Sequence, residues 1–128
     1  MNILLDTHVF LWAAMQPEQL SSKARRLLEN EETGVAVSVA TAWEISTKFR
    51  LGRLPGAKLL IANYEEAVRR LRARSLPISN AHALLAGAYK QAHRDPFDRI
   101  LAAQADIEGL TLVSKDRALR QFGVKLLW

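Results

Sequence analysis

The chain has 128 residues, a formal net charge of +5 and no cysteine. This length suits one domain with its own core, and a content of 49% hydrophobic and 24% charged residues is ordinary for a soluble globular protein. The lack of cysteine excludes disulfides, zinc–thiolate sites and cysteine nucleophiles. Because no apolar stretch approaches the roughly 20 residues of a membrane helix and no signal peptide is recognisable, we expect a cytoplasmic protein without membrane contact.

Short apolar runs alternate with helical stretches along the chain. Strands are predicted at residues 2–5, 34–38, 75–78, 110–114 and 124–127, and helices at 7–15, from Ser21 or Ser22, at 41–51, 58–73, 82–89 and 97–107, with a last short helix from Ser114 or Asp116. Strands that are apolar throughout are typical of a parallel sheet covered on both faces. We therefore predict a single α/β domain over residues 1–128, a three-layer sandwich around about five strands.

Four acidic residues lie where such a fold would bring them together. Asp6 ends the first apolar run and Asp116 follows the fourth, whereas Glu44 and Asp98 lie near the starts of two helices. In a parallel sheet the starts of the helices and the ends of the strands share one edge, where ligands bind. Carboxylates gathered there repel one another unless a cation holds them. The pattern thus predicts a metal-dependent enzyme.

Each of these acids also has a purely structural interpretation. Asp6 and Asp116 could cap the helices that follow them, and Asp98 could stabilise the positive end of its own helix. Glu44 could form an ion pair with Lys48. Capping best explains Asp95, which lies directly before Pro96. The structural interpretation is weakest for Asp98, because its helix is apolar on most sides and an unpaired buried charge is costly.

The ligand types indicate which cation to expect. Carboxylate oxygens and water favour Mg²⁺, with Mn²⁺ as a plausible substitute. His8, His82 and His93 have no metal-ligand spacing, so we interpret all three as structural. Carboxylates with Mg²⁺ typically serve phosphoryl transfer. Since no P-loop or dinucleotide-binding glycine motif is present, a phosphodiester in a nucleic acid is the favoured substrate.

The positive charge is concentrated in the middle of the chain. Residues 46–99 contain eleven basic and four acidic residues. A basic region beside an acidic site suits a polyanion held over a metal, although a solubilising surface explains the charge about as well. Within this basic region, the candidate contacts to the nucleic acid are Lys48, Arg50, Arg53, Arg94 and Arg99.

The segments around the four acids form an ordered set, namely LLDTH at 4–8, WEI at 43–45 with Lys48 and LGRL at 51–54, HRDPFDR at 93–99 with AAQA at 102–105, and VSKD at 113–116. Together they resemble the motifs of PIN-domain ribonucleases, specifically the VapC-type toxins of toxin–antitoxin pairs. The match covers nearly the whole chain. One such motif is weak, but four in order at the family's spacing are specific, and they place the third acid at Asp98.

The resemblance implies a parallel sheet of order 3-2-1-4-5 and magnesium-dependent endonucleolytic cleavage of RNA. It also implies the roles of the site residues, with Asp6 and Asp98 as direct metal ligands, Glu44 and Asp116 binding a second ion or orienting water, and Thr7 and Ser114 in support, Ser114 by holding a metal-bound water. The implied partners are a second copy of the chain and a small antitoxin that covers the site and carries a DNA-binding domain.

Two alternatives remain open on the sequence. A non-catalytic RNA-binding or interaction module could keep the same fold, although it has no reason to keep four mutually repelling acids. A phosphoacceptor receiver domain shares the α/β layers and a strand-end aspartate, Asp6, but the paired acids expected after its first strand are missing. Metal-dependent cleavage, as opposed to binding alone, separates the enzyme from the binding module.

Overall fold

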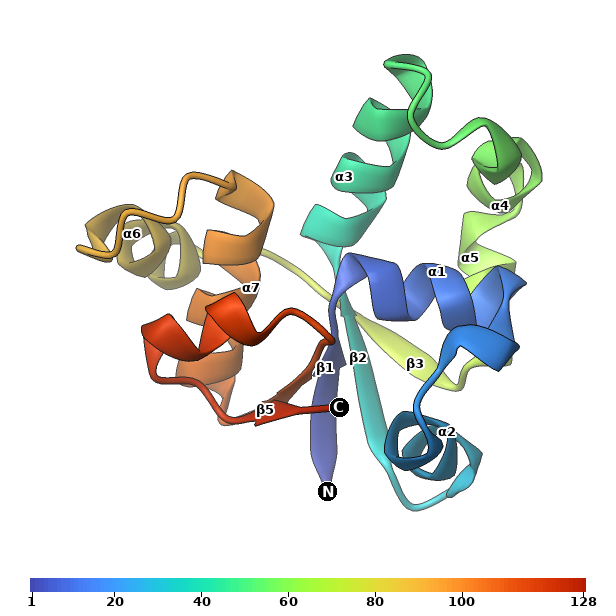
Figure 1. Cartoon of the computed structure of the whole chain (residues 1–128), viewed down its shortest axis with the longest axis horizontal. Coiled ribbons are helices and arrows are strands. Elements are labelled where there is room, and N and C mark those ends of the chain that lie inside the picture. The colour runs from blue at the N-terminus through green and yellow to red at the C-terminus, as the bar shows by residue number, and fades with distance from the viewer.

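A computed structural model describes residues 1–128 and shows a five-stranded parallel sheet with helices on both faces (Figure 1). The strands are β1 (Asn2–Leu5), β2 (Gly34–Ser38), β3 (Ala73–Leu76), β4 (Thr111–Val113) and β5 (Leu126–Leu127). Their order across the sheet is β3-β2-β1-β4-β5. The predicted three-layer α/β fold and strand order are confirmed.

The helices form two layers, one on each face of the sheet. They are α1 (Thr7–Met15), α2 (Ser22–Glu29), α3 (Val39–Arg50), α4 (Lys58–Ala62), α5 (Tyr64–Arg70), α6 (Asn80–Ala88) and α7 (Pro96–Glu108), with 3-10 turns η1 (Pro17–Gln19), η2 (Pro55–Ala57) and η3 (Arg117–Phe122). Figure 1 shows α6, α7 and η3 on one side, and α1, α2, α4 and α5 on the other. No helix combines the length and apolarity needed to cross a membrane.

The alternation of side chains along β1 divides the core between these layers. Ile3 and Leu5 belong to a cluster with α1, α2, α4 and α5, whereas Leu4 belongs to a second cluster with α7 and η3. Successive residues of a strand point to opposite faces, so a strand buried on both sides must be apolar at every position. This requirement explains the unbroken apolar run of β1.

Two predicted elements differ from the structure for identifiable local reasons, and the strand predicted at 124–127 is shorter, since β5 covers only Leu126–Leu127. The single helix expected at 58–73 is two short helices, because the backbone of Asn63 leaves the helical region and its side-chain amide donates to the Leu59 carbonyl, 3.0 Å away. Asparagine competes with helix hydrogen bonds in this way. Strand β3 begins at Ala73, two residues before the predicted start, directly after Arg72 with its positive φ of 52°. As an edge strand, β3 is largely exposed, which weakens its apolar signal.

Candidate active site

A small polar pocket lies at the carboxyl edge of the sheet. Its volume is about 190 Å³, and no hydrophobic residue lines it. The lining residues are Asp6, Thr7, His8, Glu44, Lys48, Asp95, Asp98 and Asp116. The structure therefore brings the four acids singled out by sequence to one place, together with a fifth, Asp95. The parallel topology explains this, since the ends of β1 and β4 and the starts of α3 and α7 meet at this edge.

Asp6 connects the sheet to α1. Its backbone N–H donates to the Val113 carbonyl of β4 at 3.1 Å, and its Oδ1 accepts from the Val9 N–H at 2.8 Å, which caps α1. The side chain is only 7% exposed. Burial raises the pKa of this carboxyl, and hydrogen bonds from Ser114 and Val9 partly oppose the shift. A cation beside Asp6 would favour its charged form.

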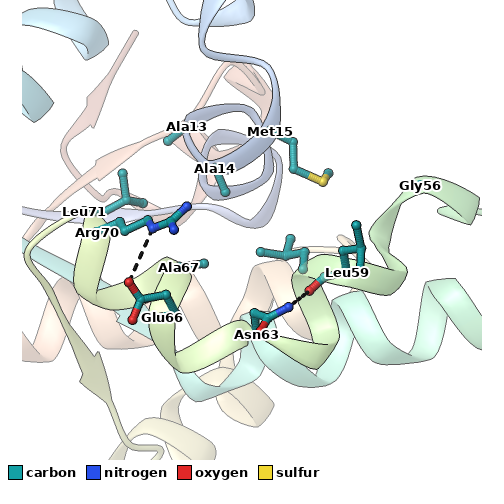
Figure 2. A pocket seen from close by; sticks show the side chains of 11 residues that line it. Ala13, Ala14, Met15, Gly56, Leu59, Asn63, Glu66, Ala67, Arg70 and Leu71 are labelled. Carbon is teal, nitrogen blue, oxygen red and sulfur yellow. Dashed lines mark hydrogen bonds and ion pairs between the residues drawn. The ribbon is translucent and has the colours of Figure 1, made fainter.

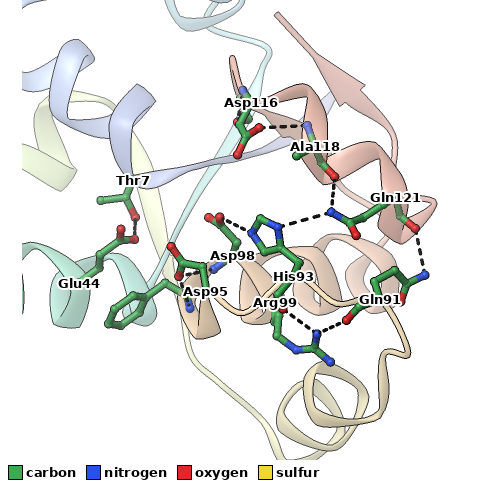
Figure 3. Close-up of polar contacts among 12 residues, drawn as sticks. Thr7, Glu44, Gln91, His93, Asp95, Asp98, Arg99, Asp116, Ala118 and Gln121 are labelled. Carbon is green, nitrogen blue, oxygen red and sulfur yellow. Dashed lines mark hydrogen bonds and ion pairs between the residues drawn. The ribbon is translucent and has the colours of Figure 1, made fainter.

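Both oxygens of Glu44 have partners within the protein. The Thr7 hydroxyl donates to Oε1 at 2.6 Å (Figure 3). The Lys48 ammonium lies 2.5 Å from Oε2. Glu44 is 3% exposed, so these contacts satisfy a carboxylate that water barely reaches. The Glu44–Lys48 pair expected from the sequence is present. Thr7 is thereby a partner of Glu44.

Asp98 lies in the first turn of α7 and shares one hydrogen bond with His93. The distance from Asp98 Oδ2 to His93 Nε2 is 2.8 Å (Figure 3). Burial raises the pKa of Asp98 to about 6; the His93 hydrogen bond opposes this shift and the nearby Asp95 reinforces it. His93 was interpreted from sequence as structural, because it has no metal-ligand spacing, and its contact with Asp98 depends on the loop between α6 and α7.

Asp95 and Asp116 both cap helices and line the pocket. Asp95 Oδ1 accepts from the N–H groups of Phe97 and Asp98 at 2.9 and 3.3 Å, as its place before Pro96 predicted. Asp116 Oδ1 accepts from the Ala118 N–H at 3.0 Å (Figure 3). From sequence, Asp95 was expected only to cap α7, and its place in the pocket was not predicted. One carboxylate does both, because a cap uses a single oxygen.

Ser114 forms hydrogen bonds with two of these acidic residues. It is fully buried, and its hydroxyl oxygen accepts from the Asp116 N–H at 3.0 Å. The same hydroxyl is a hydrogen-bond partner of the Asp6 carboxyl and lowers its pKa. His8, which the sequence analysis interpreted as structural, also lines the pocket, next to Asp6 and Thr7.

The basic candidates separate into two groups. Arg50, Arg53 and Arg94 are exposed. In contrast, the Arg99 guanidinium donates to four backbone carbonyls at 2.6 to 2.9 Å, those of Ala86, Tyr89, Gln91 and His93. Arg99 therefore fixes the loop before α7, and its guanidinium is already engaged by these four carbonyls.

The donor set fits a hard divalent cation. The pocket offers carboxylate oxygens and no sulfur, and the desolvated Asp6 and Asp98 both lack a cationic partner other than histidine. No three acidic or histidine side chains converge closely enough to form a complete metal cage. Mg²⁺ does not require one, because it usually keeps several waters and takes one or two protein carboxylates.

A larger hollow lies elsewhere, between the end of α1 and the helices α4 and α5 (Figure 2). Its volume is about 800 Å³, and seven of its eleven lining residues are hydrophobic. Its lining includes Met15, Leu59 and Leu71, with Glu66 and Arg70 forming a polar margin. We call it the apolar groove. It has one carboxylate, that of Glu66, which is paired with Arg69 and Arg70, whereas five carboxylates line the smaller acidic pocket.

Comparison with known proteins identifies the family to which the chain belongs. The chain is 29% identical over 120 residues to Ribonuclease VapC22 of Mycobacterium tuberculosis, an alignment that covers 93% of this chain and 90% of the relative. The fold is similar to that of FitAcB from Neisseria gonorrhoeae, with a TM-score of 0.68, 22% identity, and coverage of 100% and 97% of the two chains. It is also similar to VapBC2 from Rickettsia felis bound to a promoter DNA fragment, with a TM-score of 0.67, 15% identity, and coverage of 99% and 98%. The sequence model of the PIN domain matches residues 3–125, and the chain therefore belongs to the PIN domain family.

Proposed function

We propose that this protein is a magnesium-dependent endoribonuclease that acts as the toxin of a toxin–antitoxin pair. The observation that carries the proposal is the acidic pocket, which is lined by five carboxylates from four segments of the chain and by no hydrophobic residue. Membership of the PIN family and the similarity to a protein named Ribonuclease VapC22 support it. Structures of toxin–antitoxin complexes share the fold.

In this proposal Asp6 and Asp98 are the direct ligands of Mg²⁺, for which Mn²⁺ can substitute. Both carboxylates are buried, so their negative charge has lost much of its hydration. A bound cation would compensate that loss. Asp116 is more exposed and is placed to orient water or hold a second ion. Glu44 has the same proposed role, but only after Lys48 releases its Oε2.

The bound cation would supply Lewis-acid stabilisation of the charge that builds on the phosphate. The protein's own side chains would place the RNA relative to that charge. Arg50, Arg53 and Arg94 are exposed and free to contact phosphates, and Lys48 becomes available when it leaves Glu44. Ser114 would keep Asp6 and the Asp116 backbone at a fixed separation.

The antitoxin belongs to the same proposal. One structure with this fold is a toxin–antitoxin complex, and two others contain a bound DNA fragment. The apolar groove offers a hydrophobic surface with a polar margin, which suits an apolar helix or extended segment of a small partner protein. We propose that the antitoxin occupies this groove and covers the acidic pocket from there.

A homodimer completes the proposal. Val39 and Trp43 lie one turn apart on α3 and are 46% and 60% exposed, and Phe97 of α7 packs against Trp43 with ring centroids 4.9 Å apart. An exposed aromatic patch of this kind marks a contact surface. Trp43→Ser is expected to shift the antitoxin-free protein from dimer to monomer in light scattering after gel filtration. An unchanged dimer would place the interface elsewhere.

The test of the activity compares wild type with Asp98→Asn. Asparagine keeps the shape of the side chain and removes its charge. Antitoxin-free protein is incubated with total cellular RNA, in magnesium or in chelator, and the fragment ends are mapped. We expect discrete fragments only for wild type with metal. RNA binding without cleavage by well-folded wild type, at every metal concentration, would instead favour the non-catalytic RNA-binding module.

A further inference from the structure

His93 does not line the acidic pocket, yet it contacts one of the acids that do. The residue lies in the loop between α6 and α7, and its Nε2 is 2.8 Å from Asp98 Oδ2. The ring is only partly exposed and packs edge-on against Phe122 of η3, with centroids 5.6 Å apart and an interplanar angle of 84°. The imidazole is therefore held between α7 and η3.

A neighbouring glutamine determines which ring nitrogen carries the hydrogen. The Gln121 Nε2 atom lies 2.9 Å from the Ala118 carbonyl, and only the amide nitrogen can donate to that oxygen. The same nitrogen lies 3.4 Å from His93 Nδ1, which must accept from it (Figure 3). A neutral imidazole with an accepting Nδ1 carries its hydrogen on Nε2. That hydrogen is the one donated to Asp98.

Further contacts hold both ends of this chain of hydrogen bonds. The Gln91 side chain donates to the Gln121 carbonyl at 3.0 Å, and the Arg99 guanidinium donates to the His93 carbonyl at 2.9 Å. This series of hydrogen bonds joins α7, which carries Asp98, to η3, whose N-cap is Asp116. Residues that do not line the pocket thus hold two of its acids, Asp98 and Asp116, in fixed relative positions.

We propose that His93 is a positioning residue that fixes the Asp98 carboxylate for cation binding, by donating from Nε2 to Oδ2 and leaving Oδ1 for the pocket. The inference rests on the proposed metal-dependent activity and adds a residue to it. A partner that holds a ligand carboxylate in one orientation typically changes metal affinity by roughly 10- to 100-fold when it is removed. His93 and Gln121 together form such a support.

Two substitutions separate hydrogen bonding from packing. His93→Phe keeps a ring against Phe122 but has no donor, whereas His93→Gln loses the ring and keeps an amide donor at the reach of Nε2. Binding of Mn²⁺ alone to the full chain is measured by isothermal titration calorimetry without RNA. Thermal melting in chelator measures folding. We expect His93→Phe to weaken Mn²⁺ binding by roughly 10- to 100-fold and His93→Gln to remain within a few-fold of wild type.

Gln121→Leu tests the next hydrogen bond, the one that Gln121 donates to His93 Nδ1. It leaves His93 in place but removes the donor to Nδ1, so we expect a smaller loss of Mn²⁺ affinity in the same direction. Wild-type Mn²⁺ affinity in His93→Phe would overturn the inference. An equal loss in His93→Phe and His93→Gln, accompanied by lower melting temperatures, would assign His93 to loop folding and also overturn it. A wild type that binds no Mn²⁺ would overturn the proposed function itself.

Discussion

The acidic pocket and the apolar groove lie at opposite ends of α1 and differ in every physical respect. Thr7 and His8 at the start of the helix line the pocket, and Ala13, Ala14 and Met15 at its end line the groove. The pocket is small and wholly polar, whereas the groove is about four times larger and mostly apolar. Selective binding of an ion needs a few fixed oxygens, but binding of a protein segment needs apolar area. The two hollows thus suit two kinds of ligand.

The largest expected effect is on cleavage, in the pocket. Asp6→Asn keeps an oxygen that can cap α1 but removes the charge, so the fold should survive. We expect RNA cleavage to fall by more than about 100-fold, since loss of a ligand should exceed the roughly 10- to 100-fold cost of losing a ligand's partner. A gel assay of fragment release measures the effect. Cleavage within a few-fold of wild type would remove Asp6 from the site.

The next effect concerns the groove. Leu59 lines it and is 77% exposed, so Leu59→Glu should fold normally and place a charge where the proposed antitoxin packs. We expect the affinity for the antitoxin to fall by roughly 10- to 100-fold, a typical cost for a buried interface anchor, with unchanged cleavage by the free protein.

Leu84 of α6 provides the matched control, because it is 74% exposed and does not line the groove. Leu84→Glu introduces the same charge on a similarly exposed leucine. Antitoxin affinity and cleavage should both stay near wild type. Equal losses of antitoxin affinity in the two variants would contradict the placement of the antitoxin in the groove.

A third effect depends on pH and concerns only the pocket. The Asp98 pKa of about 6 lies above its ordinary value of 3.8, so the folded protein binds this proton more tightly than the unfolded chain does. Metal-free stability should therefore fall as pH rises from about 4 to 6, by up to about 3 kcal/mol from this group. Asp98→Asn should lose that dependence and be more stable than wild type at pH 7.5 in chelator. Urea unfolding at several pH values measures both, and identical slopes for the two proteins would contradict the assignment.

The smallest effect tests how the pocket is held together. Thr7→Val keeps the side-chain volume but leaves Glu44 Oε1 without its donor. A lost hydrogen bond to a charged group should destabilise the protein by about 1–3 kcal/mol. Thr41, whose hydroxyl lies 3.2 Å from that of Thr7, gives the comparison, since Thr41→Val leaves the bond to Glu44 intact. Equal destabilisation by the two changes would mean that the Thr7–Glu44 hydrogen bond adds nothing to the free energy of unfolding beyond the loss of a buried hydroxyl.

The parallel sheet and the gathering of acids were predictable because they depend on features that sequence carries directly, whereas the strand order was expected only from the resemblance to PIN-domain ribonucleases. Apolar runs identify strands buried on both faces, and parallel topology places residues such as Asp6 and Glu44 at one edge. The break at Asn63 and the early start of β3 were not predictable, because one side-chain hydrogen bond and the exposure of an edge strand decide them.

Within the site, the missed features depend on loop conformation. The contact of His93 with Asp98, and the capture of Arg99 by four carbonyls, both require the particular path of residues 89–95. An arginine in a basic region has the same sequence signal whether it contacts RNA or holds a loop. Only the positions of the carbonyls distinguish the two.

The length of α1 determines how an antitoxin could inhibit the enzyme. Nine helical residues span about 13 Å, so the two hollows are separated by little more than that distance. An extended peptide covers it with about four residues. A segment anchored in the apolar groove would need only that short continuation to bring a basic side chain into the acidic pocket. Inhibition would then require no change of fold, and a peptide much smaller than a whole antitoxin should be able to block the enzyme.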